Sequence, residues 1–209
     1  MPSSSQSSRA KKTASSPSKT AAKAKVTPKK TAAKKSSQSL NKKSTSTSSK
    51  GKIATVKGGL KIGSRAPAFS LPNEKGQMVK LSELKGKKIV VFFYPKDDTP
   101  GCTKEACSFR DGLQAIRKKG AVVLGVSADS VASHQRFSQK FDFNFPLLSD
   151  ESKAMIQAYG VWKEKSMYGR RYMGIERTTV LIAKDGTICH VFPKVKVEGH
   201  YEEVLEALG

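Results

Sequence analysis

The first part of the chain lacks acidic side chains and aromatic rings. Residues 1–58 contain no Asp or Glu, and the first aromatic residue is Phe69. The same segment carries fourteen Lys and one Arg, so it holds +15 of the net charge of +22, and the remaining residues hold +7. Such a segment buries too little apolar surface to offset a backbone ordering entropy of roughly 1–2 kcal/mol per residue. We therefore expect a disordered basic tail over residues 1–58 and one folded domain over residues 59–209.

Long apolar runs and abundant cysteines are also missing. The longest continuous apolar run covers residues 89–94, whereas a membrane-spanning helix needs roughly 20 apolar residues. No apolar segment follows Met1, so we expect no secretory signal and a chain that stays on the reducing side of membranes. The only cysteines are Cys102, Cys107 and Cys189, too few for a disulfide framework. Cysteines in such a chain are free, metal-bound or catalytic.

The histidines show no spacing typical of metal ligands. His134, His190 and His200 are far apart in the sequence, and the gap between Cys102 and Cys107 does not match a zinc-binding cysteine pair. We therefore expect no bound metal. Cys189 matches no motif, and its place in an apparent hairpin strand predicts that it packs in the interior.

The basic tail suggests a targeting signal or a nucleic-acid-binding segment. Residues 28–35, Pro-Lys-Lys-Thr-Ala-Ala-Lys-Lys, form a compact basic cluster typical of nuclear import signals and of nucleic-acid-binding segments. We therefore expect a nuclear protein whose residues 1–58 bind DNA or chromatin. A transit peptide to a chloroplast or mitochondrion remains open, although such peptides favour Arg and an amphipathic face. A solubilising leader on a cytoplasmic protein is the third alternative.

The rest of the chain alternates between strand and helix patterns. Residues 89–94 and 121–126 are almost continuously apolar, as in strands buried on both faces. Apolar residues at helical spacing predict a helix over about residues 99–118 and another around residues 131–141. These segments indicate repeated strand–helix units.

The C-terminal part continues the α/β pattern with a hairpin and a helix. Asp-Gly at residues 185–186 separates two apolar runs, a strong signal for a hairpin. Apolar residues at positions 201, 204, 205 and 208 then predict a closing helix. The order of elements predicts a three-layer α/β fold with a mixed central sheet flanked by helices.

The connection between the first strand and the first helix contains the most reactive group. Functional groups of α/β folds lie where strand C-termini meet helix N-termini. Thr99 is a good N-cap and Pro100 a favoured first helical residue, which places Cys102 in the first turn. Backbone N–H groups and the helix dipole favour an anion there, so we expect a thiolate at Cys102. A thiolate attacks peroxide and becomes a sulfenic acid, with which Cys107 can condense.

The spacing of the two cysteines has a mechanical consequence. Five residues of an intact helix rise about 7.5 Å, whereas a disulfide needs Cα atoms within roughly 7 Å. We therefore expect the first turns of this helix to unwind whenever Cys102 and Cys107 form a disulfide.

The same residues carry a resemblance to a known family. Pro95, Thr99 and Cys102 match the Pro-x-x-x-Thr-x-x-Cys signature of peroxiredoxins, and residues 99–107 resemble the bacterioferritin comigratory protein group, also called PrxQ. The resemblance covers about residues 61–209. It implies a thioredoxin-like fold of the peroxiredoxin type behind the disordered N-terminal tail.

The resemblance also implies a role for each site residue. Cys102 corresponds to the peroxidatic cysteine and Cys107 to the resolving one. Thr99 would hydrogen-bond the thiolate and the peroxide, and Pro95 would shield the cysteine. Arg177 precedes an expected core strand and would stabilise the thiolate and polarise the peroxide.

The implied activity is that of a thiol-specific peroxidase. It would reduce hydrogen peroxide and organic hydroperoxides to water and alcohols, be recycled by thioredoxin or a similar dithiol protein, and need no metal or organic cofactor. We expect a monomer. The alternative is a nucleic-acid-associated redox sensor in which oxidation of Cys102 regulates partner binding. A thioredoxin-like reductase is disfavoured because the chain has no Cys-x-x-Cys.

Overall fold

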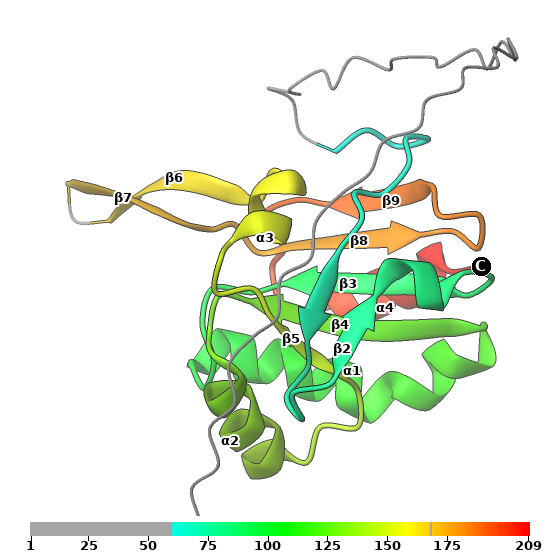
Figure 1. Ribbon diagram of the computed structural model, residues 1–209, viewed down its shortest axis with the longest axis horizontal. Coiled ribbons are helices and arrows are strands. Elements are labelled where there is room, and N and C mark those ends of the chain that lie inside the picture. Colours follow the sequence, from blue (N-terminus) through cyan, green and yellow to red (C-terminus); the bar gives the residue numbers. More distant parts are fainter. Residues whose placement is uncertain (1–59, 168) are drawn as a thin grey trace, which may run out of the picture. The chain divides into compact units, whose positions relative to one another are not determined.

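A five-stranded mixed sheet forms the centre of the domain. The computed structural model describes residues 60–167 and 169–209, and the expected tail lies outside them. The strand order is β5-β4-β3-β8-β9 (Figure 1). Strands β3, β4 and β5 are parallel, whereas β8 is antiparallel to β3 and β9 to β8. The strands are β3 (Lys88–Phe93), β4 (Ala121–Ser127), β5 (Leu147–Ser149), β8 (Thr178–Ile182) and β9 (Ile188–Phe192).

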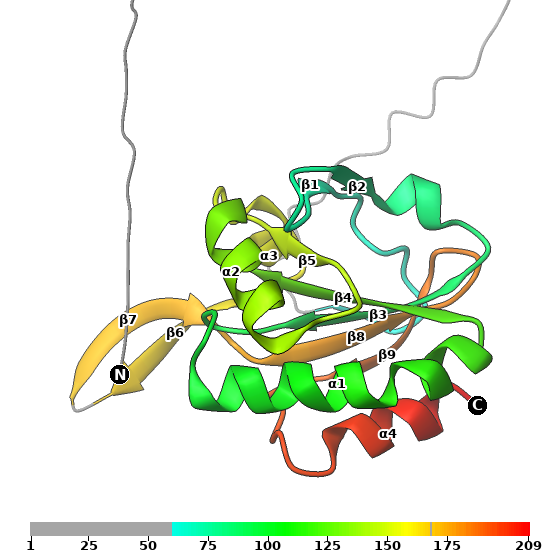
Figure 2. The ribbon, with the colours of Figure 1, turned by 90° about the horizontal axis from the view of Figure 1, so that it is seen from below.

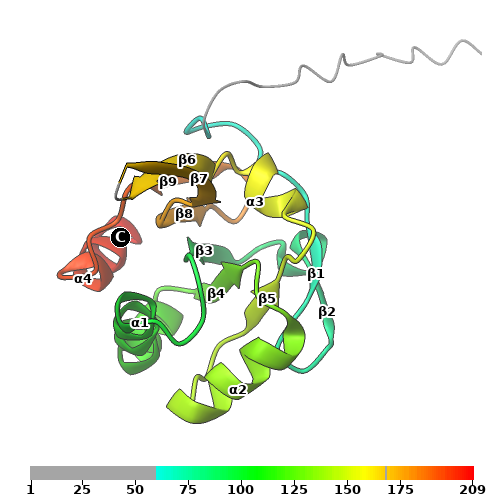
Figure 3. The same ribbon diagram turned by 90° about the vertical axis from the view of Figure 1, so that its left-hand side faces the viewer.

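Helices cover both faces of this sheet. Figures 2 and 3 show α1 and α4 side by side on one face and α3 on the opposite face. Helix α2 follows β4 and packs beside β5. The helices are α1 (Pro100–Lys118), α2 (Val131–Phe141), α3 (Ala154–Ala158) and α4 (His200–Ala207).

The side chains of β3 explain why its sequence is continuously apolar. Val90 and Phe92 pack into the core beneath α1, whereas Ile89, Val91 and Phe93 pack into the core on the other face. Successive side chains of a strand point to opposite faces, so a strand covered on both sides has no polar face. The prediction of buried strands flanked by helices is confirmed. The C-terminal end of β3 leads through a short connection into α1.

The predicted helices and hairpin are present with small changes of boundary. Helix α1 begins at Pro100, directly after the expected N-cap Thr99, and α4 begins at His200, one residue before the first apolar residue of its predicted pattern. Strands β8 and β9 form the expected hairpin around Gly186, whose φ of 86° is a conformation that glycine adopts readily. Among the described residues, no helix has the length and apolar character needed to cross a membrane.

Two small sheets were not predicted. One pairs β1 (Ser70–Pro72) with β2 (Met78–Lys80), followed by the short 3-10 helix η1 (Leu81–Leu84). The other pairs β6 (Trp162–Met167) with β7 (Arg170–Ile175), forming a hairpin that extends away from the central sheet (Figure 1). Charged residues interrupt both strands of this hairpin, so it carries no continuous apolar signal.

The prediction that Cys189 packs in the interior was wrong. Its side chain is exposed, and its Sγ donates a weak hydrogen bond to the carbonyl oxygen of Leu181 at 3.4 Å. Strand β9 lies at the edge of the sheet, where Ile188 is buried but the next two residues face outward. An apolar run on an edge strand therefore does not bury every side chain.

Candidate active site

The start of α1 places Cys102 as expected. Thr99 has extended backbone angles (φ −96°, ψ 149°), and its carbonyl oxygen accepts a hydrogen bond from the Thr103 N–H at 2.8 Å. Pro100 opens the helix, and Cys102 follows in its first turn with only 1% of its surface exposed. The thiol therefore lies where unpaired backbone N–H groups and the helix dipole favour a negative charge.

The Thr99 side chain does not cap the helix in the way that its type predicts. Its hydroxyl donates a hydrogen bond to the carbonyl oxygen of Lys96 at 3.1 Å and makes no capping contact. The hydroxyl thus stabilises the turn from Lys96 to Thr99, which directly follows the exposed Pro95. The roles of Thr99 and Pro95 toward peroxide stay predictions.

Arg177 reaches Cys102 because of the strand order. Strand β8 lies beside β3 with Thr178 opposite Phe93, so the residue before β8 lies next to the β3–α1 connection. There the Nη2 group of Arg177 donates a hydrogen bond to the Sγ atom of Cys102 at 3.3 Å. A side chain at Gly101 would place its Cβ 3.3 Å from the same nitrogen, so glycine leaves room for the guanidinium.

A carboxylate that the sequence analysis missed completes this site. Glu105 lies one turn after Cys102 and is buried beside Arg177, whose Nη1 group donates a hydrogen bond to its Oε2 atom. Its Oε1 atom is buried without a partner among the described residues. The sequence did contain one indication that Glu105 is buried, because position 105 falls on the apolar face of α1 together with Cys102 and Phe109.

Burial and the contacts of Arg177 shape the electrostatics of the site. Burial raises the pKa of Glu105 from 4.5 to about 7, against the opposing effect of the Arg177 guanidinium. Burial disfavours the charge of Arg177, but Glu105 and Cys102 together outweigh that effect and raise the pKa of Arg177. The Arg177 fork therefore stays cationic and bridges two groups that carry or develop negative charge.

A second cation lies close to this group. Burial lowers the pKa of Lys165 on β6, and the positive charge of Arg177 lowers it further, while Glu176 and Cys102 act in the opposite direction. The aliphatic part of Lys165 packs beside Gly174 on β7. Lys165 of β6 therefore adds a basic group whose charge interacts with those of Arg177 and Cys102.

Cys107 lies on the same helix but not in contact with Cys102. Helix α1 is continuous from Pro100 to Lys118, and five residues of helix rise about 7.5 Å. Both cysteines are free thiols, and Cys107 is half-buried at the edge of the core. The structure therefore describes the reduced state, with the two sulfur atoms held apart. In the described part of the chain, no three His, Cys, Asp or Glu side chains cluster as metal ligands would.

These features define a class of protein. A buried thiol at a helix N-terminus, faced by an arginine on a mixed α/β scaffold, is typical of enzymes that use cysteine as a redox nucleophile. The AhpC/TSA family model matches residues 62–191, and the chain belongs to this family.

Curated relatives match the domain along almost their whole length. The chain is 53% identical to the putative peroxiredoxin bcp of Coxiella burnetii over 149 residues, which is 71% of this chain and 99% of the relative. It is 47% identical to peroxiredoxin Bcp of Bacillus subtilis, with 71% and 95% of the two chains covered. The described domain therefore corresponds to a complete bacterial peroxiredoxin of the Bcp group.

Solved structures support the same conclusion. Bacterioferritin comigratory protein of Xanthomonas campestris matches with a TM-score of 0.65 and 46% identity, covering 67% of this chain and 89% of that one. A PrxQ mutant of Xylella fastidiosa matches with a TM-score of 0.69 and 39% identity, covering 72% and 96%. The predicted thioredoxin-like fold of the peroxiredoxin type is confirmed, and the chain is a peroxidase of the Bcp/PrxQ type.

Proposed function

We propose that Cys102 is the peroxidatic cysteine and Cys107 the resolving cysteine of a thioredoxin-dependent peroxidase. The observation that carries this proposal is the hydrogen bond from Arg177 Nη2 to the buried Cys102 Sγ atom. An arginine beside a thiol at a helix N-terminus stabilises the thiolate, which is the attacking form. The similarity to peroxiredoxins over 149 residues favours this function over the redox-sensor alternative.

The first step oxidises the cysteine and reduces the peroxide. The Cys102 thiolate attacks one peroxide oxygen, the O–O bond breaks, and the other oxygen leaves as water or an alcohol after taking up a proton. Negative charge develops on the leaving oxygen, where the Arg177 guanidinium and the N–H groups of the first turn stabilise the transition state. Thr99 orients the peroxide and Pro95 shields the sulfur.

The second step consumes the sulfenic acid. The Cys107 sulfur attacks the Cys102 sulfur, a disulfide forms, and the hydroxyl group leaves as water. The first turns of α1 unwind for this step, because the intact helix holds the two residues too far apart. A dithiol protein such as thioredoxin then reduces the disulfide by thiol–disulfide exchange and becomes oxidised itself.

The proposed substrates are hydrogen peroxide and organic hydroperoxides. The similar protein of Xanthomonas campestris is described for its alkyl peroxide reduction activity, which supports the organic substrates. Nothing in the proposed chemistry requires a metal or an organic cofactor.

Turnover of peroxide tests the proposed roles of the cysteines. Purified protein is mixed with hydrogen peroxide, thioredoxin, thioredoxin reductase and NADPH, and NADPH oxidation is followed. We expect turnover by the wild type and none by Cys102→Ser, while Cys189→Ser, which alters an exposed thiol outside the site, behaves as the wild type. Equal turnover by the wild type and Cys102→Ser would reject the peroxidatic role of Cys102.

The resolving role of Cys107 needs a separate measurement. Cys107→Ser should lose one thiol per chain in a single round with peroxide but form no intramolecular disulfide. Mass spectrometry of the oxidised wild type should find a disulfide between Cys102 and Cys107. An oxidised wild type without this disulfide would reject the proposed resolving step.

We also propose that residues 1–58 bind DNA and place the protein in the nucleus. Their +15 charge supports this proposal, since each neutralised phosphate contributes about −0.9 to the log–log slope of affinity against salt. The expected binding is independent of base sequence and steeply salt-dependent. Protein that begins at residue 59 retains residues 62–191, which the family model matches, and should lose this DNA binding. Equal DNA affinity of the two proteins at low salt would refute this proposal. We expect both to be monomers.

A further inference from the structure

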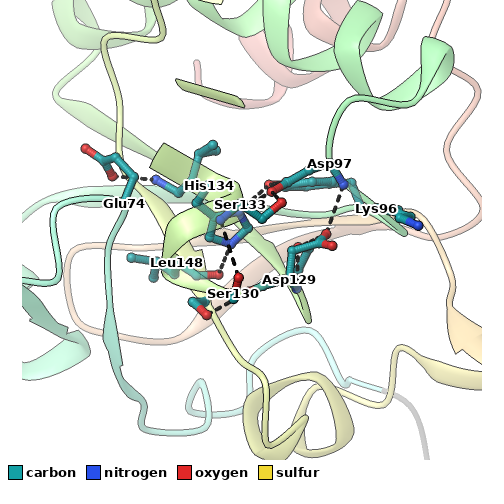
Figure 4. A network of polar contacts seen from close by, with 12 residues as sticks. Glu74, Lys96, Asp97, Asp129, Ser130, Ser133, His134 and Leu148 are labelled. Atoms are coloured by element: carbon teal, nitrogen blue, oxygen red, sulfur yellow. Dashed lines mark hydrogen bonds and ion pairs between the residues drawn. The ribbon is translucent and has the colours of Figure 1, made fainter. Parts of the chain in front are cut away.

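A buried carboxylate fixes the connection between β3 and α1. Asp97 lies two residues before Thr99 and is only 7% exposed. Its two oxygens accept hydrogen bonds from the Tyr94 hydroxyl at 2.8 Å and the Ser133 hydroxyl at 2.7 Å, and His134 Nδ1 lies 2.8 Å from Oδ2. Figure 4 shows Ser133 and His134 of α2 converging on Asp97. The connection before the reactive cysteine is therefore attached to a different helix.

His134 is placed to form an ion pair with this carboxylate. Its side chain is fully buried, and its Nε2 atom lies 3.2 Å from the carbonyl oxygen of Leu148 (Figure 4). Both ring nitrogens thus face hydrogen-bond acceptors, so both contacts are satisfied when both nitrogens carry hydrogen. Desolvation of two charges offsets much of the attraction in a buried pair, so such a pair contributes less to overall stability than to a defined geometry.

Two neighbouring contacts strengthen the same attachment. The backbone N–H of Asp97 donates to Oδ2 of Asp129 at 2.9 Å, and the Ser127 hydroxyl donates to the same oxygen at 2.7 Å. Asp98, whose φ of 52° turns the chain sharply toward α1, forms an exposed ion pair with Lys140 of α2 at 2.7 Å. Two successive residues of the connection are therefore bound to α2 or to the segment that leads into it.

We propose that Asp97 and His134 are positioning residues that hold the first turn of α1 in its folded state and so control how fast Cys102 leaves the site. This inference rests on the proposed function, in which Cys102 must leave its position to reach Cys107. A segment anchored at Asp97 has fewer residues free to move when the helix unwinds. The anchor therefore limits the entropy gained by unwinding.

The anchor affects the two fates of the sulfenic acid in opposite ways. While the helix is folded, Cys102 faces the peroxide site, where a second peroxide molecule oxidises the sulfenic acid to a sulfinic acid and is itself reduced to water. Once the helix unwinds, the Cys107 thiol reacts with the sulfenic acid to give the disulfide and water. A weaker anchor favours the second fate at the expense of the first.

The test compares two equivalent substitutions in the full chain. Asp97→Asn weakens the anchor. Asp150→Asn is the matched control, because Asp150 is also buried and its side chain accepts hydrogen bonds from the Ala154 and Ile156 N–H groups at the start of α3 rather than from the β3–α1 connection. Each protein receives the same excess of hydrogen peroxide without reductant. Mass spectrometry then gives the ratio of Cys102–Cys107 disulfide to Cys102 sulfinic acid.

Hydrogen bonds to a charged group change an equilibrium by roughly tenfold or more, so we expect Asp97→Asn to raise this ratio at least about tenfold. The ratio for Asp150→Asn should stay within about twofold of the wild type, although the protein is destabilised. A ratio for Asp97→Asn within about twofold of the wild type would overturn the proposal. An equal rise in both variants would also overturn it, since loss of stability alone would then explain the change.

A milder variant covers the case in which Asp97→Asn does not fold. Ser133→Ala removes one hydrogen-bond donor to the Asp97 carboxylate and leaves the contact with His134, so we expect a rise of about tenfold. An unchanged ratio would overturn the proposal in that case. A wild type that forms no Cys102–Cys107 disulfide would overturn the resolving step itself, which separates that failure from a failure of the anchor.

Discussion

Replacement of Arg177 by lysine separates the charge of this residue from its shape. Arg177 uses Nη1 for Glu105 and Nη2 for Cys102, so one planar fork bridges two groups. Lysine keeps the positive charge but has a single nitrogen on a flexible stem. It cannot reproduce both contacts in the same geometry. We expect its nitrogen to pair with the buried Glu105 rather than with Cys102.

The expected loss follows from the position of the fork. Removing one preorganised donor to the developing negative charge lowers a rate by about 10²- to 10³-fold. Because lysine keeps part of the electrostatic effect, we expect the lower end for Arg177→Lys, about 10²-fold, or about 3 kcal/mol of transition-state stabilisation. Arg171→Lys on the β6–β7 hairpin is the matched control, since this arginine is 80% exposed, and should leave the rate unchanged.

Single-turnover kinetics give the relevant rate. Reduced protein is mixed with hydrogen peroxide in a stopped-flow instrument, and the second-order rate constant for thiol oxidation is measured without reductant. Recovery of the Cys102–Cys107 disulfide in the variant shows that the chemistry is slowed rather than redirected. A rate constant for Arg177→Lys within threefold of the wild type would refute the argument that the fork geometry stabilises the transition state.

Further predictions concern stability and the fate of the sulfenic acid. Burial raises the pKa of Glu105 from 4.5 to about 7. Between these two pH values the folded protein therefore holds a proton on Glu105 that the unfolded chain has lost. The free energy of unfolding therefore falls as the pH rises, and Glu105 contributes about 2–3 kcal/mol of this fall between pH 5 and pH 8. In urea unfolding experiments, Glu105→Gln should lack this contribution. Parallel pH profiles of the wild type and Glu105→Gln would contradict the prediction. Gly112→Ala should cost about 1–3 kcal/mol, since its Cβ would lie 2.0 Å from the Tyr201 ring on α4, whereas the exposed Gln114→Ala should not destabilise the fold in the same denaturation assay. Cys107→Ser should accumulate sulfinic acid on Cys102 at least about tenfold faster than the wild type in excess peroxide, as measured by mass spectrometry, because the competing condensation is lost.

The site elements that depend on local sequence were predictable. Pro100 and the extended Thr99 define the start of α1 through backbone preferences of a few consecutive residues, so the place of Cys102 in the first turn followed from the sequence. The burial of β3 on both faces likewise follows from its continuous apolar run, which is typical of a strand covered on both sides. These features depend on contacts over a few residues or on simple periodicity.

Side-chain partners within the site were less predictable. Thr99 sits at the N-cap position, yet its hydroxyl bonds to Lys96 rather than to the helix. Glutamate is usually a surface residue, and its burial at position 105 depends on the ion pair with Arg177. Cys189 looked like a core residue because a strand pattern does not reveal that its strand lies at the sheet edge.

The sequence by itself determined the position of Cys102, the proposed nucleophile, together with the helix that presents it and the spacing that separates it from Cys107. Only the tertiary structure brought Arg177 to Cys102, because β8 pairs with β3 across a long stretch of chain. It also joined Asp97 to His134, which local patterns assign to a loop and to a helix face. The physical reason is that caps and periodicity act between near neighbours, whereas these pairs form only where strand order and helix packing place distant segments side by side.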